Sequence, residues 1–190
     1  MAIERRDGDE SDLDVAVNAA RTGAGWALEH IYESLAPAVA GLFHAHGVDD
    51  PDDLTSEVFV GVLRNLAWFD GDATSFRSWV FTIAYRRLTD ERRRGARRPA
   101  PIPLADLPEP RAADDVDYEV ERSLAAQRVR ALCDGLVPAQ RDVILLRVFG
   151  DLTVDQVAGV VGKSRGAVKA LQRRGYATIA RLLGNEGVPL

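Results

Sequence analysis

The stretch from Val154 to Leu171, VDQVAGVVGKSRGAVKAL, predicts two helices joined by a tight turn. Thr153 is placed to cap the first helix, with Gln156 three residues further on, as a capping box requires. Gly162 stands where the first helix must end in a left-handed turn, which glycine adopts without steric cost. Ser164 is placed to cap the second helix. This order of signals is typical of a helix-turn-helix that enters a DNA major groove.

The second helix of this pair separates its apolar residues from its cations. Val168 and Leu171 fall on one side and predict a buried stripe. The positions predicted to stay exposed are Arg165, Lys169, Gln172, Arg173 and Arg174. No acid lies between Asp155 and Glu186, which suits a surface for phosphates and base edges. A helical hairpin with a solvated basic face is the alternative, but spacing, turn, cap and charge together favour DNA binding.

Composition limits the class of protein. The chain has 190 residues, 46% of them hydrophobic and 28% charged, which suits one or two small domains. Its longest nearly apolar run, residues 35–43, contains Pro37 and is too short to span a bilayer. The polar N-terminus resembles no signal peptide, and Cys133 is the only cysteine. We therefore expect a cytoplasmic protein without membrane insertion, internal disulfide or cysteine-based metal cluster.

Charge is segregated along the chain, although the net charge is only −5. Residues 4–14, 49–57 and 106–121 are acidic, whereas residues 86–98 and the helix-turn-helix are basic. Two basic surfaces separated by acidic stretches predict two DNA contacts on one polypeptide.

Prolines place a boundary in the middle of the chain. Five of them, at positions 99, 101, 103, 108 and 110, exclude a continuous helix there and predict an extended linker. The predicted divisions are an acidic tail (1–11), a helical domain (12–97), the linker (98–116), a second helical domain (117–185) and a short tail (186–190). No period-two strand pattern is present, so the predicted class is all-α, with two helical domains joined by a proline-rich linker.

Helical spacing organises the first of these domains. The predicted helices cover residues 12–21, 25–46, 51–68 and 76–94, and Pro37 is expected either to bend the second of them or to mark a weak point in it. Thr74 or Ser75 is the predicted cap of the fourth helix. Asp52, Asp53 and Glu57 lie near the start of the third helix, where the helix dipole alone would favour them. From the residues themselves, that structural role and a role in binding a partner stay equally open.

Two segments carry a resemblance to a known family. Residues 52–94, DDLTSEVFVGVLRNLAWFDGDATSFRSWVFTIAYRRLTDERRR, resemble region 2 of bacterial sigma factors, most closely the extracytoplasmic-function (ECF) group. Residues 136–182, LVPAQRDVILLRVFGDLTVDQVAGVVGKSRGAVKALQRRGYATIARL, resemble region 4. The resemblance implies a promoter-specificity subunit of RNA polymerase that is not itself an enzyme and needs no cofactor. It implies as partners the core polymerase (the β′ clamp helices and the β subunit), promoter DNA and an anti-sigma factor docked between the domains.

The resemblance also implies roles for three sets of residues. Those for polymerase binding are Asp52, Asp53, Glu57 and Phe59. Those for the melted minus-ten element are Phe69, Asp70, Gly71, Arg77, Trp79, Arg86, Arg87, Asp90 and Arg93. Those for the minus-thirty-five duplex are Arg165, Lys169, Ala170, Gln172, Arg173 and Arg174. A melted base needs stacking surfaces and its strand needs cations, which aromatic residues beside arginines supply.

The chain departs from the family pattern at three positions. Ser56 replaces the usual glutamine of the polymerase-binding helix, and Arg86 replaces an asparagine that many members carry in the minus-ten helix. Gly175 stands where alanine is usual, which predicts a weaker helix and a bend before residues 176–183.

Two other classes are open on the sequence. A regulator that works without polymerase would use the same helix-turn-helix, as a dimer on palindromic half-sites, and would not need the acidic helix or the aromatic-arginine helix. A serine recombinase would need an α/β catalytic domain, for which no strand pattern is present. Neither metal-ligand spacing nor a phosphate-binding glycine loop appears in the sequence. The paired resemblance favours the sigma factor over both.

Overall fold

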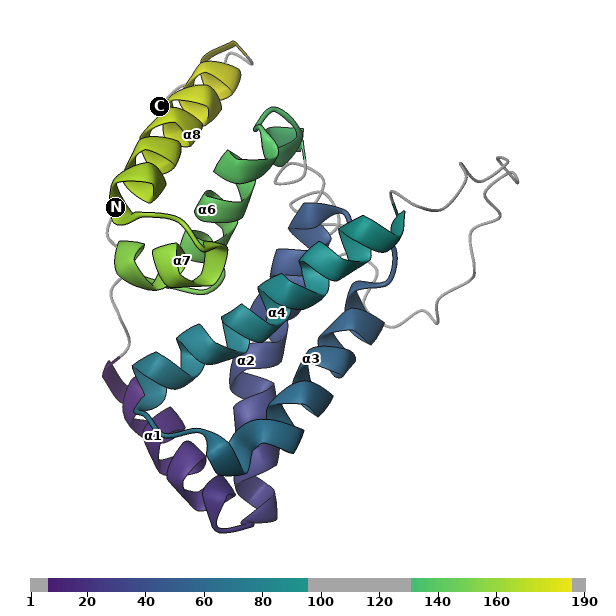
Figure 1. Cartoon of the computed structure of the whole chain (residues 1–190), viewed down its shortest axis with the longest axis vertical. Coiled ribbons are helices and arrows are strands. Elements are labelled where there is room, and N and C mark those ends of the chain that lie inside the picture. The colour runs from purple at the N-terminus through teal and green to yellow at the C-terminus, as the bar shows by residue number, and fades with distance from the viewer. Residues whose placement is uncertain (1–6, 96–130, 186–190) are drawn as a thin grey trace, which may run out of the picture.

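The computed structural model describes residues 7–95 and 131–185, and every regular element in these two stretches is a helix (Figure 1). The elements are α1 (Asp7–Arg21), α2 (Gly25–His46), α3 (Pro51–Asn65), the 3-10 helix η1 (Leu66–Trp68), α4 (Ala73–Gly95), α6 (Pro138–Val148), α7 (Val154–Val161) and α8 (Arg165–Asn185). Residues 131–134 are helical as well. The predicted all-α class is confirmed, while the predicted linker at 98–116 lies outside the described residues.

Helices α1 to α4 form the N-terminal domain. Helix α2 packs between α1 and α3, and α4 contacts all three (Figure 1). Its largest fully buried side chains include Phe43, Phe76 and Phe81. Each such ring contributes about 1.5–3 kcal/mol by leaving water, so this aromatic core fixes how α4 lies on the bundle.

Helix α2 passes through Pro37 without ending. It continues to His46 and stops at Gly47, whose φ of 69° is left-handed. The Gly47 amide donates to the His44 carbonyl and the Val48 amide to the Phe43 carbonyl. The sequence predicted these bounds correctly, and proline weakens the helix locally without breaking it.

The start of α4 differs from the prediction. The helix begins at Ala73, and the Asp72 carboxylate caps it by accepting a hydrogen bond from the Ser75 amide at 2.8 Å. Thr74 and Ser75 therefore lie inside the first turn, and the prediction that one of them is the cap is wrong. Aspartate is as good a helix cap as serine or threonine. The Ala73 amide also donates to the Asp14 carboxylate of α1, and this contact with the bundle stabilises the earlier start of α4. Hydrogen bonds from the Ser75 hydroxyl and amide lower the pKa of Asp72.

Helices α6, α7 and α8 form the described part of the C-terminal domain, and the predicted turn chemistry is confirmed. The Thr153 amide donates to Gln156 Oε1 at 2.7 Å and the Gln156 amide to Thr153 Oγ1 at 3.3 Å, which completes the capping box. Gly162 ends α7 with a φ of 63°, and Ser164 Oγ accepts from the Ala167 amide. Val168 is fully buried.

Helix α8 shows why a glycine stands at position 175. The helix runs unbroken from Arg165 to Asn185, so the expected bend at Gly175 is wrong. A Cβ at Gly175 would lie 2.4 Å from Ile144 Cδ1 of α6. Glycine therefore permits close approach of α8 to α6. It lowers the helix propensity at this position, but it allows the two helices to pack closely there.

Two glycines of the helix-turn-helix give a matched stability test. Gly162→Ala is expected to lower the free energy of unfolding by about 1 kcal/mol, because alanine is strained at a left-handed φ. Gly159→Ala, inside α7 with open space around it, is expected to raise it by up to about 1 kcal/mol through helix propensity. Urea unfolding of the full chain followed by circular dichroism measures both. Equal effects of the two substitutions would contradict the left-handed turn.

The two domains pack against each other. Helix α4 contacts α7 and α2 contacts α6, so buried residues of both domains belong to one continuous apolar cluster (Figure 1). None of the helices in the described stretches has the length and hydropathy needed to cross a membrane.

Candidate nucleic-acid interface

The first half of α8 presents the predicted minus-thirty-five residues. Arg165, Lys169, Arg173 and Arg174 are exposed, whereas Ala170 and Gln172 are half-buried. Arg165 to Lys169 to Arg173 are steps of four residues, which place three cations along one face over about 12 Å. That length matches the width of a DNA major groove, about 12 Å. Arg165 Nε lies 3.3 Å from Asp155 Oδ1 of α7, so the first cation of this row forms an ion pair with an acid of the neighbouring helix.

The second half of α4 presents a second charged face. Arg86, Asp90 and Arg93 are exposed at steps of four and three residues, so they share one side of the helix. Arg93 Nη1 lies 3.4 Å from Asp90 Oδ1. Arg87 points elsewhere, because its Nη1 contacts Glu57 Oε2 of α3 at 3.3 Å. Of the predicted minus-ten arginines, the structure thus brings Arg86 and Arg93 together and separates Arg87 from them.

Aromatic rings support the loop that precedes α4. The ring centroid of Phe69 lies 5.1 Å from that of Phe76 and 5.1 Å from that of Trp79, and the latter two rings are 5.5 Å apart. Arg21 of α1 lies with its Cζ 5.4 Å from the Phe69 centroid and donates to the Gly71 carbonyl at 3.3 Å. The predicted residues Phe69 and Trp79 are therefore a platform under the loop, with Phe76 fully buried.

Gly71 and its neighbours form the exposed part of this loop. A Cβ at Gly71 would lie 2.8 Å from Phe69 Cζ, so the loop can lie flat on the platform only with glycine there. Asp70 and Asp72 are exposed, whereas Arg77, in the first part of α4, is half-buried.

Trp68 is a candidate that the sequence did not single out. Its side chain is 86% exposed at the end of η1, immediately before the loop. The rings of Phe69, Phe76 and Trp79 are packed against one another, whereas the exposed Trp68 ring is available to stack on a planar group of a partner. Its position in the turn could have indicated this exposure. Leu66 is the residue of that turn that faces inward and is buried, so Trp68 is left to face outward.

The acidic end of α3 is exposed and does not depend on Asp52 or Asp53 for its cap. Asp50 supplies the cap by accepting from the Asp53 amide at 2.9 Å. Asp52 and Asp53 point to solvent, and Glu57, which pairs with Arg87, is half-exposed. The helix dipole still favours the two exposed acids, but the capping function is already filled.

Phe59 does not belong to this exposed surface. Only 5% of it is exposed, and its ring centroid lies 4.9 Å from that of Tyr32 on α2. The prediction that Phe59 contacts a partner protein directly is therefore wrong. Phe59 packs against Tyr32, and the Tyr32 side chain is exposed instead. Valine and leucine at nearby positions give the same helical pattern, so spacing alone does not say which apolar residue faces outward.

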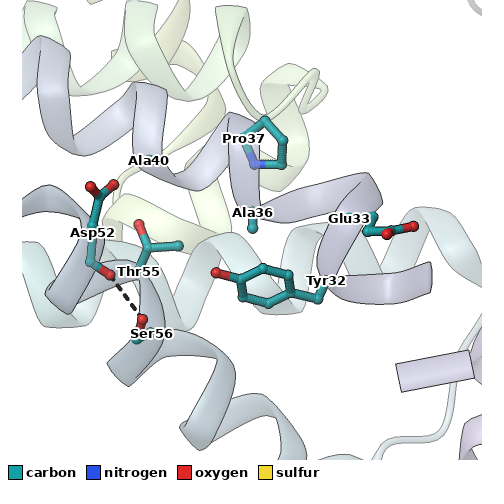
Figure 2. A pocket seen from close by; sticks show the side chains of 8 residues that line it. All are labelled: Tyr32, Glu33, Ala36, Pro37, Ala40, Asp52, Thr55 and Ser56. Carbon is teal, nitrogen blue, oxygen red and sulfur yellow. Dashed lines mark hydrogen bonds between the residues drawn. The ribbon is translucent and has the colours of Figure 1, made fainter. Parts of the chain in front are cut away.

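A pocket of about 320 Å³ lies beside these acids, between α2 and α3 (Figure 2). Tyr32, Ala36 and Pro37 line one side, and Asp52 and Ser56 line the other. The Ser56 hydroxyl donates to the Asp52 carbonyl at 3.0 Å. The surface thus combines an apolar hollow with a negative rim.

A buried polar cluster joins the two domains through Asp142 of α6, which is 7% exposed. Tyr85 Oη donates to Asp142 Oδ2 at 2.8 Å, and Arg92 Nη2 donates to Asp142 Oδ1 at 3.0 Å. Both donors lie on α4. His46 Nε2, at the end of α2, lies 3.8 Å from Asp142 Oδ1. No pattern in the sequence predicted this cluster.

The proton on His46 can be placed from its neighbours. Arg92 Nη2 lies 2.7 Å from His46 Nδ1, and because arginine only donates, Nδ1 must accept. Neutral imidazole then carries its proton on Nε2, facing Asp142. Burial, with Arg92 beside it, lowers the pKa of His46 to about 3, so the ring is neutral at physiological pH. Burial next to Asp142 raises the pKa of Tyr85, which keeps the hydroxyl protonated as a donor.

Comparison with known proteins gives matches along the same two domains. The family models Sigma-70 region 2 and Sigma-70 region 4 match residues 31–98 and 133–180. The ECF RNA polymerase sigma factor BldN of Streptomyces coelicolor is 30% identical over 186 residues, covering 95% of this chain and 69% of BldN. The chain belongs to the ECF RNA polymerase sigma factors. The ECF sigma factor SigK of Mycolicibacterium vanbaalenii is 29% identical over 182 residues, covering 92% of this chain and 90% of SigK.

A solved structure shows the same fold. It is that of CnrH in complex with the cytosolic domain of CnrY, with a TM-score of 0.68 and 23% identity, over 93% of this chain and 99% of that one. The predicted membership of the ECF group is confirmed, and with it the function of an alternative sigma factor of RNA polymerase. A regulator acting without polymerase and a recombinase are not favoured.

Proposed function

We propose that this ECF sigma factor binds core polymerase through the exposed end of α3, reads the minus-thirty-five duplex with α8 and holds the melted minus-ten strand with α4 and the loop before it. The observation that carries the proposal is the separation of one acidic and two basic exposed faces on three different helices. Such a chain directs polymerase to promoters in the cytoplasm and has no catalytic site of its own.

The division of DNA contacts follows from the form of each face. Helix α8 offers a straight row of cations as long as a major groove is wide, which suits duplex DNA, and Lys169 and Arg173 lie where base edges are read. Arg165 and Arg174 suit phosphates. The loop at residues 70–75 offers exposed polar groups above a ring platform, with Arg86 and Arg93 on the adjoining helix for strand phosphates. Trp68 supplies a stacking surface for an unpaired base.

The polymerase contact combines charge with apolar area. Asp52 and Asp53 supply the charge, and Tyr32 and the pocket beside it supply the apolar surface. Clamp helices of the β′ subunit are the proposed partner here, with the β subunit as a further contact of the holoenzyme. By analogy with CnrH, which forms a complex with the cytosolic domain of CnrY, we also propose a protein partner that holds this chain inactive, an anti-sigma factor.

Exchange of the loop tests the minus-ten assignment. Replacing Asp70–Ser75 with the loop of a relative that uses another promoter is expected to move minus-ten preference and leave minus-thirty-five preference unchanged. Phe69 is kept, because it belongs to the platform. Holoenzyme transcription on single-base promoter variants measures the preference, and permanganate footprinting shows whether strand opening follows the loop. Unchanged minus-ten preference in a folded variant would make the loop a plain connector.

A further inference from the structure

Helix α1 carries a polar stripe on the side of the loop that precedes α4. Asp14, Asn18 and Arg21 lie at steps of four and three residues, which place them on one side of the helix. The neighbouring side is apolar, with Leu13 in the core. Figure 1 shows the loop between η1 and α4 beside this helix. Because α1 precedes residues 31–98, the match to the region 2 family model assigns this stripe no role.

Asp14 holds the end of the loop that leads into α4. Its carboxylate accepts a hydrogen bond from the amide of Ala73, the first residue of α4. That amide is one of the donors that a helix leaves unpaired at its start, and the helix dipole also favours a carboxylate there. Asp72 fills the neighbouring capping position by accepting from the Ser75 amide. The start of α4 is therefore fixed twice, once by the loop itself and once by α1.

Arg21 holds the middle of the loop. Its Nη2 donates to the Gly71 carbonyl at 3.3 Å, and its Cζ lies 5.4 Å from the centroid of the Phe69 ring. Its Nη1 donates to Asn18 Oδ1 at 3.2 Å, one turn earlier in α1. The Nε atom is enclosed and has no hydrogen-bond partner in the described part of the chain. The guanidinium thus binds the backbone and the supporting ring of the loop and is partly covered by them.

These contacts determine which groups of the loop face outward. With its carbonyl bonded to Arg21, Gly71 lies flat on the Phe69 ring, where an added Cβ would be 2.8 Å from Cζ. Asp70 and Asp72, on either side, remain exposed. A flipped base is read by hydrogen bonds to its edge, and such bonds require donors and acceptors placed to within about 0.5 Å. A loop that moved by more than this would accept several bases.

We propose that α1 sets the shape of the loop at residues 70–72, so that Arg21 and Asp14 determine which base of the minus-ten element the loop accepts. Both are positioning residues, because they bind the loop and its supporting ring and not the DNA strand. The inference rests on the proposed assignment of this loop to the melted minus-ten strand. It adds a specificity-determining element that lies outside the matched region 2.

Two substitutions release the loop and two test the reason for it. Arg21→Ala removes the contacts to the loop carbonyl and ring, and Asp14→Ala removes the acceptor for the Ala73 amide. Asp14→Asn is the rescue variant, because it keeps an acceptor oxygen at the same position without the charge. Arg64→Ala removes an exposed arginine from the last turn of α3, so it is the matched control for loss of a cation. All are made in the full chain, and circular dichroism checks their helix content.

Hydrogen–deuterium exchange of the free chain measures whether α1 holds the loop. The peptide that covers residues 69–76 is expected to take up deuterium about tenfold faster in both alanine variants, because hydrogen bonds to charged groups hold it in the parent chain. Asp14→Asn and Arg64→Ala are expected to match the parent. Unchanged uptake in both alanine variants would overturn the proposal.

Holoenzyme transcription on promoters with single-base exchanges in the minus-ten element measures the consequence. At the position that the loop contacts, preference for the best base is expected to fall by about tenfold in both alanine variants, which is the discrimination of one base contact. Preference in the minus-thirty-five element is expected to stay unchanged, because α8 lies in the other domain. Asp14→Asn and Arg64→Ala are expected to keep the preference of the parent chain.

The outcomes separate the role of α1 from the proposed function. An even loss of transcription on all minus-ten variants, with base preference retained, would overturn the positioning role and leave α1 a structural one. An even loss with a shallower salt dependence in Arg21→Ala would make this arginine a phosphate contact instead. If the parent chain itself showed no minus-ten preference, the proposed function would fail and the specificity role with it, while deuterium uptake would still show whether α1 holds the loop.

Discussion

Replacing Asp52 and Asp53 together with arginine is expected to reduce association with core RNA polymerase by roughly a hundredfold or more. Juxtaposed like charges at an interface cost several kcal/mol, and each 1.4 kcal/mol is about tenfold in affinity. The fold is expected to be unaffected, because both side chains are exposed and Asp50 provides the cap of α3. Binding of the labelled chain to core polymerase, followed by fluorescence anisotropy, measures the effect.

The control is Asp12→Arg with Glu29→Arg, the same charge change on α1 and α2, away from the acidic end of α3. Glu57 is left unchanged, because its loss would also release Arg87 and confuse polymerase binding with DNA binding. Normal association of the Asp52/Asp53 variant would return these acids to the role of favouring the helix dipole. Equal loss in the control would show a general charge effect instead of a site.

Replacing Lys169 and Arg173 together with alanine is expected to reduce transcription by about a hundredfold on the preferred minus-thirty-five sequence. Each good contact to a base edge contributes about 1–3 kcal/mol of discrimination, so promoters altered at the contacted bases should change far less. Arg165→Ala and Arg174→Ala are expected to weaken all promoters alike and to make binding less salt-dependent.

The measurement is holoenzyme transcription across single-base variants of the minus-thirty-five element at two salt concentrations. Arg165 carries an internal check, because Asp155→Ala should free this arginine and alter all promoters together. If the four substitutions reduced transcription evenly across the variants, the division into base readers and phosphate binders would be wrong.

Local signals made the helix-turn-helix predictable from the sequence. The capping box joins Thr153 to Gln156 within a single turn, and Gly162 needs only its own φ to end a helix. The bounds of α2 were predictable for the same reason, since Gly47 ends it through contacts to the turn before. Such interactions lie within one turn of helix, where spacing and residue type are sufficient evidence.

Contacts between distant residues were not predictable in this way. Asp142 meets Tyr85 and Arg92 from far along the chain, and nothing local marks it as buried. From the sequence alone, Gly175 is expected to weaken its helix. The reason why a glycine stands there is its close packing against Ile144, which the sequence does not reveal. The depth of Phe59 and the exposure of Trp68 likewise depend on which neighbours cover each ring. The sequence thus predicted candidate site residues, while their division between surface and support depends on the tertiary packing.

Run-off transcription with purified core polymerase on a library of randomised upstream sequences tests the central claim most directly. We expect the chain to make transcription depend on two sequence blocks, near minus thirty-five and minus ten, with the upstream block lost in the Lys169/Arg173 variant and the downstream block changed by the loop exchange. Transcription no greater and no more selective than that of core polymerase alone, with a folded chain present, would contradict it.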